Sequence, residues 1–200
     1  YLNKYGTKPV TIPPGWDDWH GIVGGGNYFD TRIFENGKAN QYTGPYQTNL
    51  LGNIATNIIA RDVPQAAPLF LYASFYAPHS GSPVEADDPR ISTPAVAPEW
   101  KDHYAGVDFA RGPAYNEADV SDKPSYVRTK GRVTSGMQAQ LKESFQQRAE
   151  SLESMDTAVG KMLDALAAAG ELDNTLIIFT SDNGYMRGEH RIHAGKTVPY

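Results

Sequence analysis

The sequence has no cysteine, so no disulfide can form within these 200 residues. No apolar run approaches the ~20 residues that a membrane-spanning helix needs. The opening residues, Tyr1–Gly6, lack the apolar core of a signal peptide. Basic residues are not in excess, because 18 Lys and Arg face 23 Asp and Glu for a formal charge of -5. We therefore expect no nucleic-acid partner and no membrane span.

What the chain does contain is a repeated pattern of helix followed by strand. Apolar residues recur at helical spacing over residues 46–60 and again over 137–169, and Gly170 suits the end of the second helix. Continuous apolar runs follow at 69–75 and 175–180, a pattern typical of strands buried on both faces. This order predicts an α/β fold with a mixed, mostly parallel sheet flanked by helices.

Three further segments have their own signatures. Asn36-Gly37 between residues 28–34 and 39–42 predicts a hairpin with a type I′ turn. Residues 1–27, rich in Gly, Pro and Trp, predict an irregular packed loop. Residues 78–124 carry seven prolines and almost no periodicity, so we expect an irregular segment that wraps over a surface.

Polar residues stand where both predicted strands end, the usual place for ligands in α/β sheets. Asp182 and Asn183 offer oxygen ligands for calcium or magnesium, although Asp-Asn-Gly is also a common turn sequence. His79 ends the earlier strand and titrates near neutral pH, although such a histidine is more often a satisfied structural group. Five basic or titratable residues follow within the next stretch and suit an oxyanion: Arg187, His190, Arg191, His193 and Lys196.

These residues resemble motifs of the sulfatase family, within the alkaline-phosphatase-like superfamily. The resemblance is carried by Glu171–Gly184 with its Ser-Asp-Asn-Gly end, by Gly188-Glu189-His190, by Gly195-Lys196 with Tyr200, and by Ala77-Pro78-His79. Tyr1–Gly6, Pro13–Trp19 and Val120–Pro124 look like the N-acetylglucosamine-6-sulfatase branch. The resemblance extends over essentially the whole chain.

The resemblance implies a calcium-dependent sulfuric-ester hydrolase that acts on a sulfated carbohydrate or an aryl sulfate. Asp182 and Asn183 would then be calcium ligands, and Lys196 would contact a sulfate oxygen. His79 would bind the sulfate or the bridging oxygen and help the alcohol to leave, and His190 would be a substrate-binding residue. The family also implies a secreted, periplasmic or lysosomal location.

One family feature is not in this sequence. Sulfatases use a formylglycine made from Cys or Ser within a Cys/Ser-x-Pro/Ala-x-Arg motif, and no such motif occurs here. We therefore expect residues 1–200 to be the central part of a sulfatase catalytic domain, truncated at both ends and inactive alone, with the formylglycine upstream. Two alternatives stay open: a phosphodiesterase or phosphonate hydrolase of the same superfamily, and a noncatalytic module that binds sulfated glycans.

Overall fold

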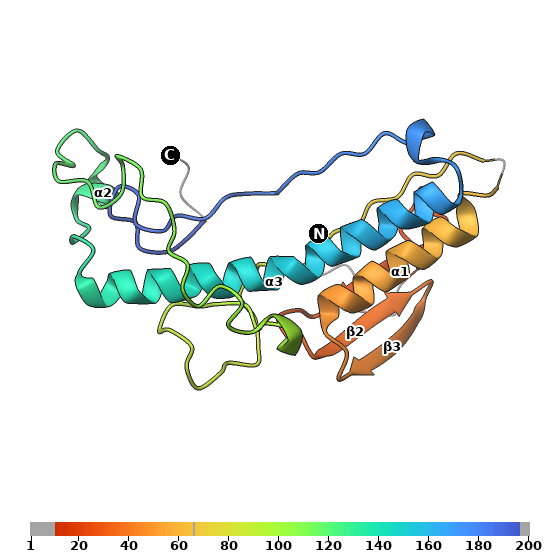
Figure 1. Cartoon of the computed structure of the whole chain (residues 1–200), viewed down its shortest axis with the longest axis horizontal. Coiled ribbons are helices and arrows are strands. Elements are labelled where there is room, and N and C mark those ends of the chain that lie inside the picture. The colour runs from red at the N-terminus through yellow and green to blue at the C-terminus, as the bar shows by residue number, and fades with distance from the viewer. Residues whose placement is uncertain (1–10, 66, 197–200) are drawn as a thin grey trace.

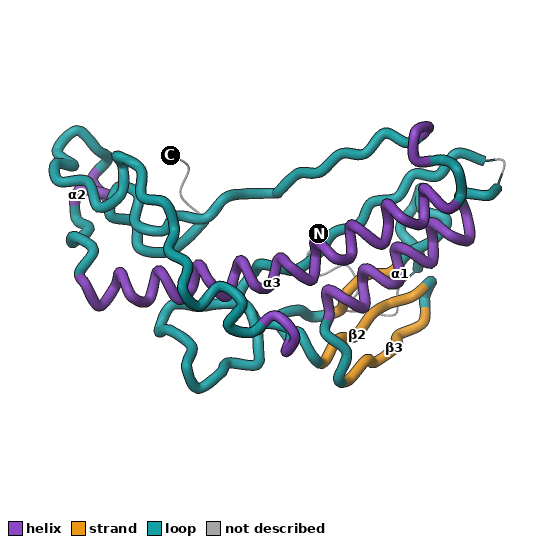
Figure 2. The backbone as a smooth tube through the Cα atoms, in the orientation of Figure 1, coloured by secondary structure: helices purple, strands orange, loops and turns teal. Residues whose placement is uncertain are grey.

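The computed structural model describes residues 11–65 and 67–196. One long helix, α3 (Ser135–Ala168), runs along most of the molecule, and α1 (Gln47–Asp62) packs beside its C-terminal half (Figure 1). A small sheet lies next to α1, and irregular chain covers the N-terminal half of α3 (Figures 1 and 2). The resemblances noted at Tyr1–Gly6 and Tyr200 fall outside the described residues.

The sheet is antiparallel, with strands in the order β1 (His20–Val23), β2 (Asp30–Glu35) and β3 (Lys38–Thr43). The predicted hairpin is confirmed: β2 and β3 pair around a turn in which Asn36 and Gly37 have φ of 51° and 92°, as a type I′ turn requires. The irregular loop predicted for residues 1–27 is wrong at β1, which pairs with β2. Four residues that include a glycine carry too little alternation to be told from a loop.

Both predicted helices are confirmed. The Thr134 side chain accepts a hydrogen bond from the backbone N–H of Met137 and caps the start of α3. At the other end Gly170 has φ of 75°, and the N–H groups of Gly170 and Glu171 bond to the carbonyls of Ala167 and Leu166. This is the Schellman arrangement expected of a C-terminal glycine.

The predicted mostly parallel sheet is not confirmed, because the one sheet in the described residues is antiparallel. Residues 69–75 and 175–180 are extended and leave the same end of the α1–α3 pair, but neither run pairs with a strand of the described chain (Figures 1 and 2). Their predicted burial is wrong here, since Phe70 is 78% exposed and Leu176 is 86% exposed. A run buried on both faces needs strands beside it and layers above and below, and this chain places none there.

The irregular segment 78–124 is confirmed, with only the short 3-10 helix η1 (Pro98–Trp100) inside it. It is followed by the short helix α2 (Ser125–Arg128), while the 3-10 helix η2 (Leu172–Asn174) comes after α3. Buried polar side chains of α3 bond this irregular backbone, which lacks a ladder of its own. Gln146 donates to the carbonyls of Ala105 and Val107, and Glu150 accepts from the N–H of Tyr104.

Candidate active site

The predicted catalytic residue His79 lies in a tight turn supported by buried aromatic rings. Its backbone carbonyl accepts a hydrogen bond from the Tyr28 hydroxyl at 2.6 Å, and its ring lies 4.8 Å from the ring of Tyr76. Tyr28 is fully buried, and burial raises its pKa, so its hydroxyl remains a donor. The His79 Nδ1 lies 2.8 Å from the carbonyl of Ser80. Because a carbonyl can only accept, Nδ1 carries the proton and the exposed imidazole keeps Nε2 for other chemistry.

The predicted metal ligands Asp182 and Asn183 lie in an exposed turn after the extended run 175–180. The Ser181 hydroxyl donates to the Asn183 carbonyl at 2.6 Å, and the Asn183 amide nitrogen donates to the Gly184 carbonyl at 2.8 Å. The amide oxygen of Asn183 is therefore left as an acceptor, and the Asp182 carboxylate forms no hydrogen bond or ion pair with the described residues.

These two oxygen donors fit a hard cation such as calcium, which takes about 6–8 oxygen ligands. Within residues 11–65 and 67–196, no group of three or more His, Cys, Asp and Glu side chains could hold a metal ion. The turn therefore supplies a part of a calcium site.

Lys196 follows a second turn that folds back on the first. The backbone N–H of Met186 donates to the carbonyl of Gly195 at 2.9 Å, so the chain before Lys196 pairs with the residue after Tyr185. Lys196 is exposed. This pairing brings the predicted sulfate-binding lysine back to the segment that carries Asp182.

His190 is held by a loop more than seventy residues earlier in the chain. Its Nδ1 lies 2.7 Å from the Glu117 carboxylate, and the ammonium of Lys123 lies 3.2 Å from the other oxygen of that carboxylate. The hydrogen bond with His190, followed by that with Lys123, holds the pKa of Glu117 below its ordinary value. His190 and Arg191 have φ of 49° and 62°, an uncommon backbone conformation for residues other than glycine.

A buried arginine of α3 joins the turns that carry His79 and Asp182. The Arg148 guanidinium donates to the carbonyls of Pro78 and Ser92, and its central carbon lies 4.1 Å from the ring centroid of Tyr185. Pro78 directly precedes His79, and Tyr185 follows Asp182 by three residues. No hydrogen bond or ion pair in the described residues joins His79, Asp182, Asn183 and Lys196 directly, so Arg148 makes the connection between their segments.

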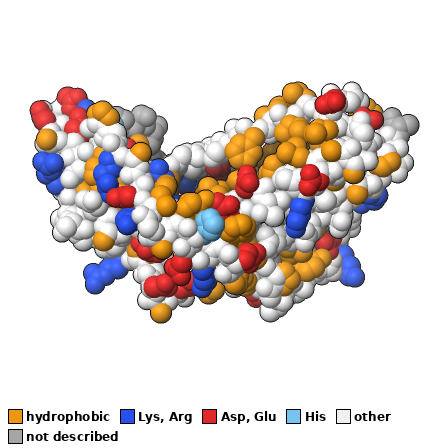
Figure 3. All heavy atoms as spheres, viewed as in Figure 1, with side chains coloured by type: hydrophobic (Ala, Val, Ile, Leu, Met, Phe, Trp, Pro, Cys, Tyr) orange, Lys and Arg blue, Asp and Glu red, His pale blue; other side chains and the backbone are white. Residues whose placement is uncertain are grey.

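An open cavity of about 370 Å³ lies beside the His79 turn, and it is lined by Ser80, Gly81, Val84 and residues 88–93. The carbonyl of Ser92 on its wall is one of the two that Arg148 binds. Seen from one side, the molecule is also hollowed between its two ends, with hydrophobic side chains along the hollow (Figure 3).

The sequence offered no signal for Glu117, which is 73 residues from His190 and lies in a segment without periodicity. Arg148 did have a signal. It falls at three- and four-residue steps from Phe145 and Leu152, and therefore interrupts the apolar stripe of its helix. A charged residue in that position indicates a specific buried partner.

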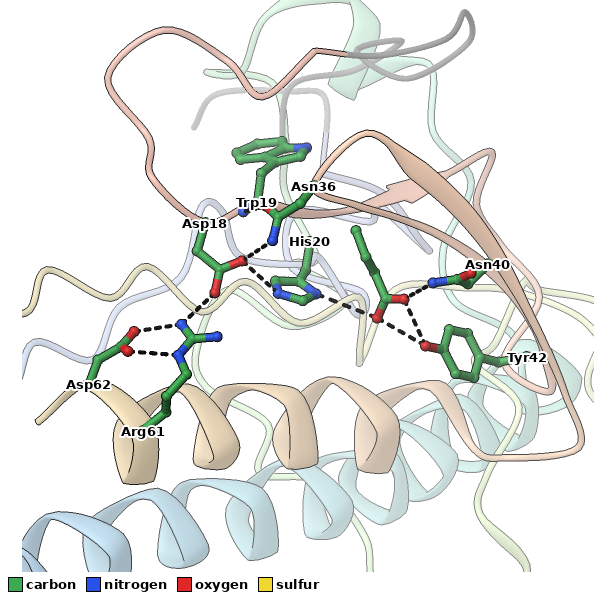
Figure 4. A network of polar contacts seen from close by, with 9 residues as sticks. Asp18, Trp19, His20, Asn36, Asn40, Tyr42, Arg61 and Asp62 are labelled. Carbon is green, nitrogen blue, oxygen red and sulfur yellow. Dashed lines mark hydrogen bonds and ion pairs between the residues drawn. The ribbon is translucent and has the colours of Figure 1, made fainter.

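A second polar cluster lies on the sheet, away from the predicted site residues (Figure 4). His20 lies between Asp18 and Glu35, at 2.9 Å and 3.5 Å, and Arg61 of α1 pairs with Asp18 at 2.6 Å. Burial raises the pKa of Asp18, but hydrogen bonds from Arg61 and Asn36 outweigh it and hold that pKa below its ordinary value. The cluster joins the sheet to the end of α1, and a structural role accounts for it.

Comparisons with known proteins agree with this arrangement. The family model described as Sulfatase matches residues 9–200, so the chain belongs to the sulfatase family. It is similar to a Drosophila melanogaster protein named "Extracellular sulfatase SULF-1 homolog", with 33% identity over all of this chain and 17% of the relative. It is also similar to the N-acetylglucosamine-6-sulfatase of Capra hircus, with 28% identity over all of this chain and 35% of the relative.

The chain thus spans about a third or less of the length of these relatives. A solved structure titled as BT4656 in complex with its substrate D-glucosamine-2-N,6-O-disulfate has a TM-score of 0.63 and 21% identity. It matches 90% of this chain and 46% of its own. This likeness shows a sulfatase-type fold. No helix in the described ranges is both long and apolar enough to cross a membrane.

Proposed function

We propose that this chain is the central part of the catalytic domain of a calcium-dependent sulfuric-ester hydrolase that acts on a sulfated sugar or an aryl sulfate. The proposal rests on one observation above the others. In a chain that matches the sulfatase family over nearly its whole length, the turn before His79 and the segment after Asp182 pack against the same guanidinium.

The side chains of this chain supply binding and proton transfer. The Lys196 ammonium binds a sulfate oxygen as a point charge. The His79 ring is fixed through Nδ1 by the Ser80 carbonyl, so its protonated Nε2 can give a proton to the alcohol oxygen as the S–O bond breaks. His190 binds the substrate from the loop that Glu117 anchors. Fixed donors of this kind stabilise the charge that develops on the leaving oxygen.

Asp182 and Asn183 would hold calcium through their side-chain oxygens, with the remaining ligands supplied by other chain and water. When bound, calcium neutralises the charge of the sulfate group. The formylglycine nucleophile would come from a segment outside these 200 residues, because the sequence has no Cys/Ser-x-Pro/Ala-x-Arg motif.

The substrate and location follow the relatives. A neighbouring fold is titled with a sulfated glucosamine as substrate, and one relative is named an N-acetylglucosamine-6-sulfatase, which supports a sugar 6-sulfate. Another relative is named an extracellular sulfatase, which supports a secreted, periplasmic or lysosomal enzyme.

The test is sulfate release by the full-length protein that contains this chain, with N-acetylglucosamine 6-sulfate and 4-nitrophenyl sulfate as substrates. We expect hydrolysis of at least one, and a loss of about 10²–10³ in rate for His79→Ala and for Lys196→Ala, the scale for removal of one preorganised donor. Lys161→Ala, an exposed lysine of α3, is the control and should keep its activity. Hydrolysis of phosphodiesters alone, or binding of sulfated glycans without turnover, would contradict the proposal and favour one of the alternatives.

A further inference from the structure

Arg148 is a buried cation in the middle of a helix. It is 8% exposed and lies in the apolar stripe of α3 between Phe145 and Leu152. Burial of a long charged side chain is costly unless a partner of opposite charge compensates it. No carboxylate of the described chain forms an ion pair with Arg148. A residue of this kind requires a reason other than packing.

Neutral groups surround the guanidinium. Two of its nitrogens donate to the carbonyls of Pro78 and Ser92, and the third lies 3.4 Å from the Ser144 hydroxyl. The ring of Tyr185 covers one face at 4.1 Å. Burial, with a further contribution from Arg187, lowers the pKa of Arg148, while Tyr185 and Tyr28 act in the opposite direction. An arginine remains protonated at neutral pH under such conditions, so its charge is hydrogen-bonded but not cancelled.

The contacts of Arg148 reach three separate segments. Pro78 precedes His79, and Ser92 lies on the wall of the cavity beside that turn. Tyr185 belongs to the turn that follows Asp182, and Met186 next to it pairs with Gly195 before Lys196. The planar guanidinium presents its donors in a fixed fork, so it sets the separation of the carbonyls that it binds. One side chain thereby fixes the segments that the proposed reaction uses.

We propose that Arg148 is a positioning residue of the sulfate site: it holds the His79 turn and the Tyr185 turn in place, and its uncancelled positive charge favours binding of the sulfate anion. The proposal rests on the proposed function for the identity of the anion. It differs from a purely structural role, because it requires that the charge of Arg148 affects anion binding and that its fork affects turnover.

The test separates charge from geometry in the full-length protein. Arg148→Met removes both, and Arg148→Lys keeps the charge but cannot span two carbonyls with a fork. Lys161→Met is the matched control, because it removes a positive charge from an exposed position on the same helix. Each variant is measured for kcat, KM, the inhibition constant of inorganic sulfate and thermal stability.

We expect Arg148→Met to weaken inhibition by sulfate about tenfold and to lower kcat/KM by about 10–10², on the scale of one lost electrostatic donor. Arg148→Lys should restore inhibition by sulfate to within about threefold of the parent while kcat stays about tenfold low. The control should change neither value more than about twofold. If the methionine variant does not fold, the lysine variant with Tyr185→Leu decides the question, since both should lower kcat more than they change KM.

Two results would overturn the proposal. One is a folded Arg148→Met protein with unchanged sulfate inhibition and kcat but a lower melting temperature, which would make the residue merely structural. The other is Arg148→Lys that behaves like the parent in kcat. Direct binding of inorganic sulfate, measured by calorimetry, distinguishes this failure from failure of the proposed function. A parent protein that binds sulfate but hydrolyses no ester would refute the function, and the methionine variant would still decide the role of Arg148.

Discussion

At the scale of single residues, two histidines differ in the partner of Nδ1. His79 meets the neutral carbonyl of Ser80 and is exposed, which leaves Nε2 free to exchange a proton with a substrate. His190 meets the carboxylate of Glu117 and is mostly buried, with 16% of its side chain exposed. The first arrangement suits proton transfer, and the second suits a fixed position. The two histidines therefore have different parts in the proposed site.

The ion pair of Glu117 predicts a pH dependence of stability. The pKa of Glu117 is below its ordinary value of 4.5 because of His190 and then Lys123. A carboxyl group with a lowered pKa contributes stability that is complete above 4.5 and lost as the pH falls through the folded-state value. Glu117→Gln should therefore lower the melting temperature of the full-length protein at pH 6, and the difference should shrink as the pH falls below about 4.

Asp122→Asn is the control for this experiment. Asp122 also pairs with Lys123, at 2.7 Å, but 69% of its side chain is exposed. Exposed pairs contribute little, so its loss should change the melting temperature less than the loss of Glu117. A difference for Glu117→Gln that stays constant from pH 6 to pH 3 would show that the carboxylate charge has no role there.

At the scale of elements, α3 organises the chain around it. Its side chains bond the irregular segment 78–124 on one half, and its other half packs against α1. The two helices approach closely where Gly52 of α1 meets Ala158 of α3. A Cβ added to Gly52 would lie 2.4 Å from the Cβ of Ala158, which is closer than such atoms can approach.

This contact predicts opposite effects for two glycines in helices. Gly52→Ala gains about 1 kcal/mol of helix propensity but forces the helices apart, and overpacking typically costs about 1–3 kcal/mol. We expect net destabilisation. Gly160→Ala, on α3 with nothing within 4 Å of the added Cβ, should stabilise by up to about 1 kcal/mol. Denaturant unfolding of the full-length protein measures both, and equal effects would contradict the close helix contact.

The helices and the hairpin could be predicted from sequence because their signals are local. The 3.6-residue period gave α1 and α3, and Asn36-Gly37 gave the turn between β2 and β3. The burial of residues 69–75 and 175–180 could not be predicted correctly, because an apolar run does not say whether its neighbours belong to the same stretch of chain. Arg148 and Glu117 depend on partners 70 and 73 residues away, and no spacing rule covers such pairs.

At the scale of the whole molecule, the two extended runs are the clearest irregularity. Phe179 is 73% exposed and Ile178 is 78% exposed, although both lie in a run with the composition of a buried strand. The chain spans 35% of the N-acetylglucosamine-6-sulfatase that it matches from end to end. We expect the runs to be covered in the full-length protein, and we expect the isolated 200 residues to bind calcium weakly and to hydrolyse no sulfate ester.

The central claim, that Asp182 belongs to the calcium site of a sulfatase, is tested most directly by calcium titration of sulfate release by the full-length protein. We predict that the parent and Asp173→Ala, an exposed carboxylate near the start of the same run, are activated by calcium and silenced by a chelator. Asp182→Ala should show no release at any calcium concentration, because calcium loses a first-shell ligand. Calcium-dependent turnover by Asp182→Ala, or turnover by the isolated 200-residue chain, would contradict the account.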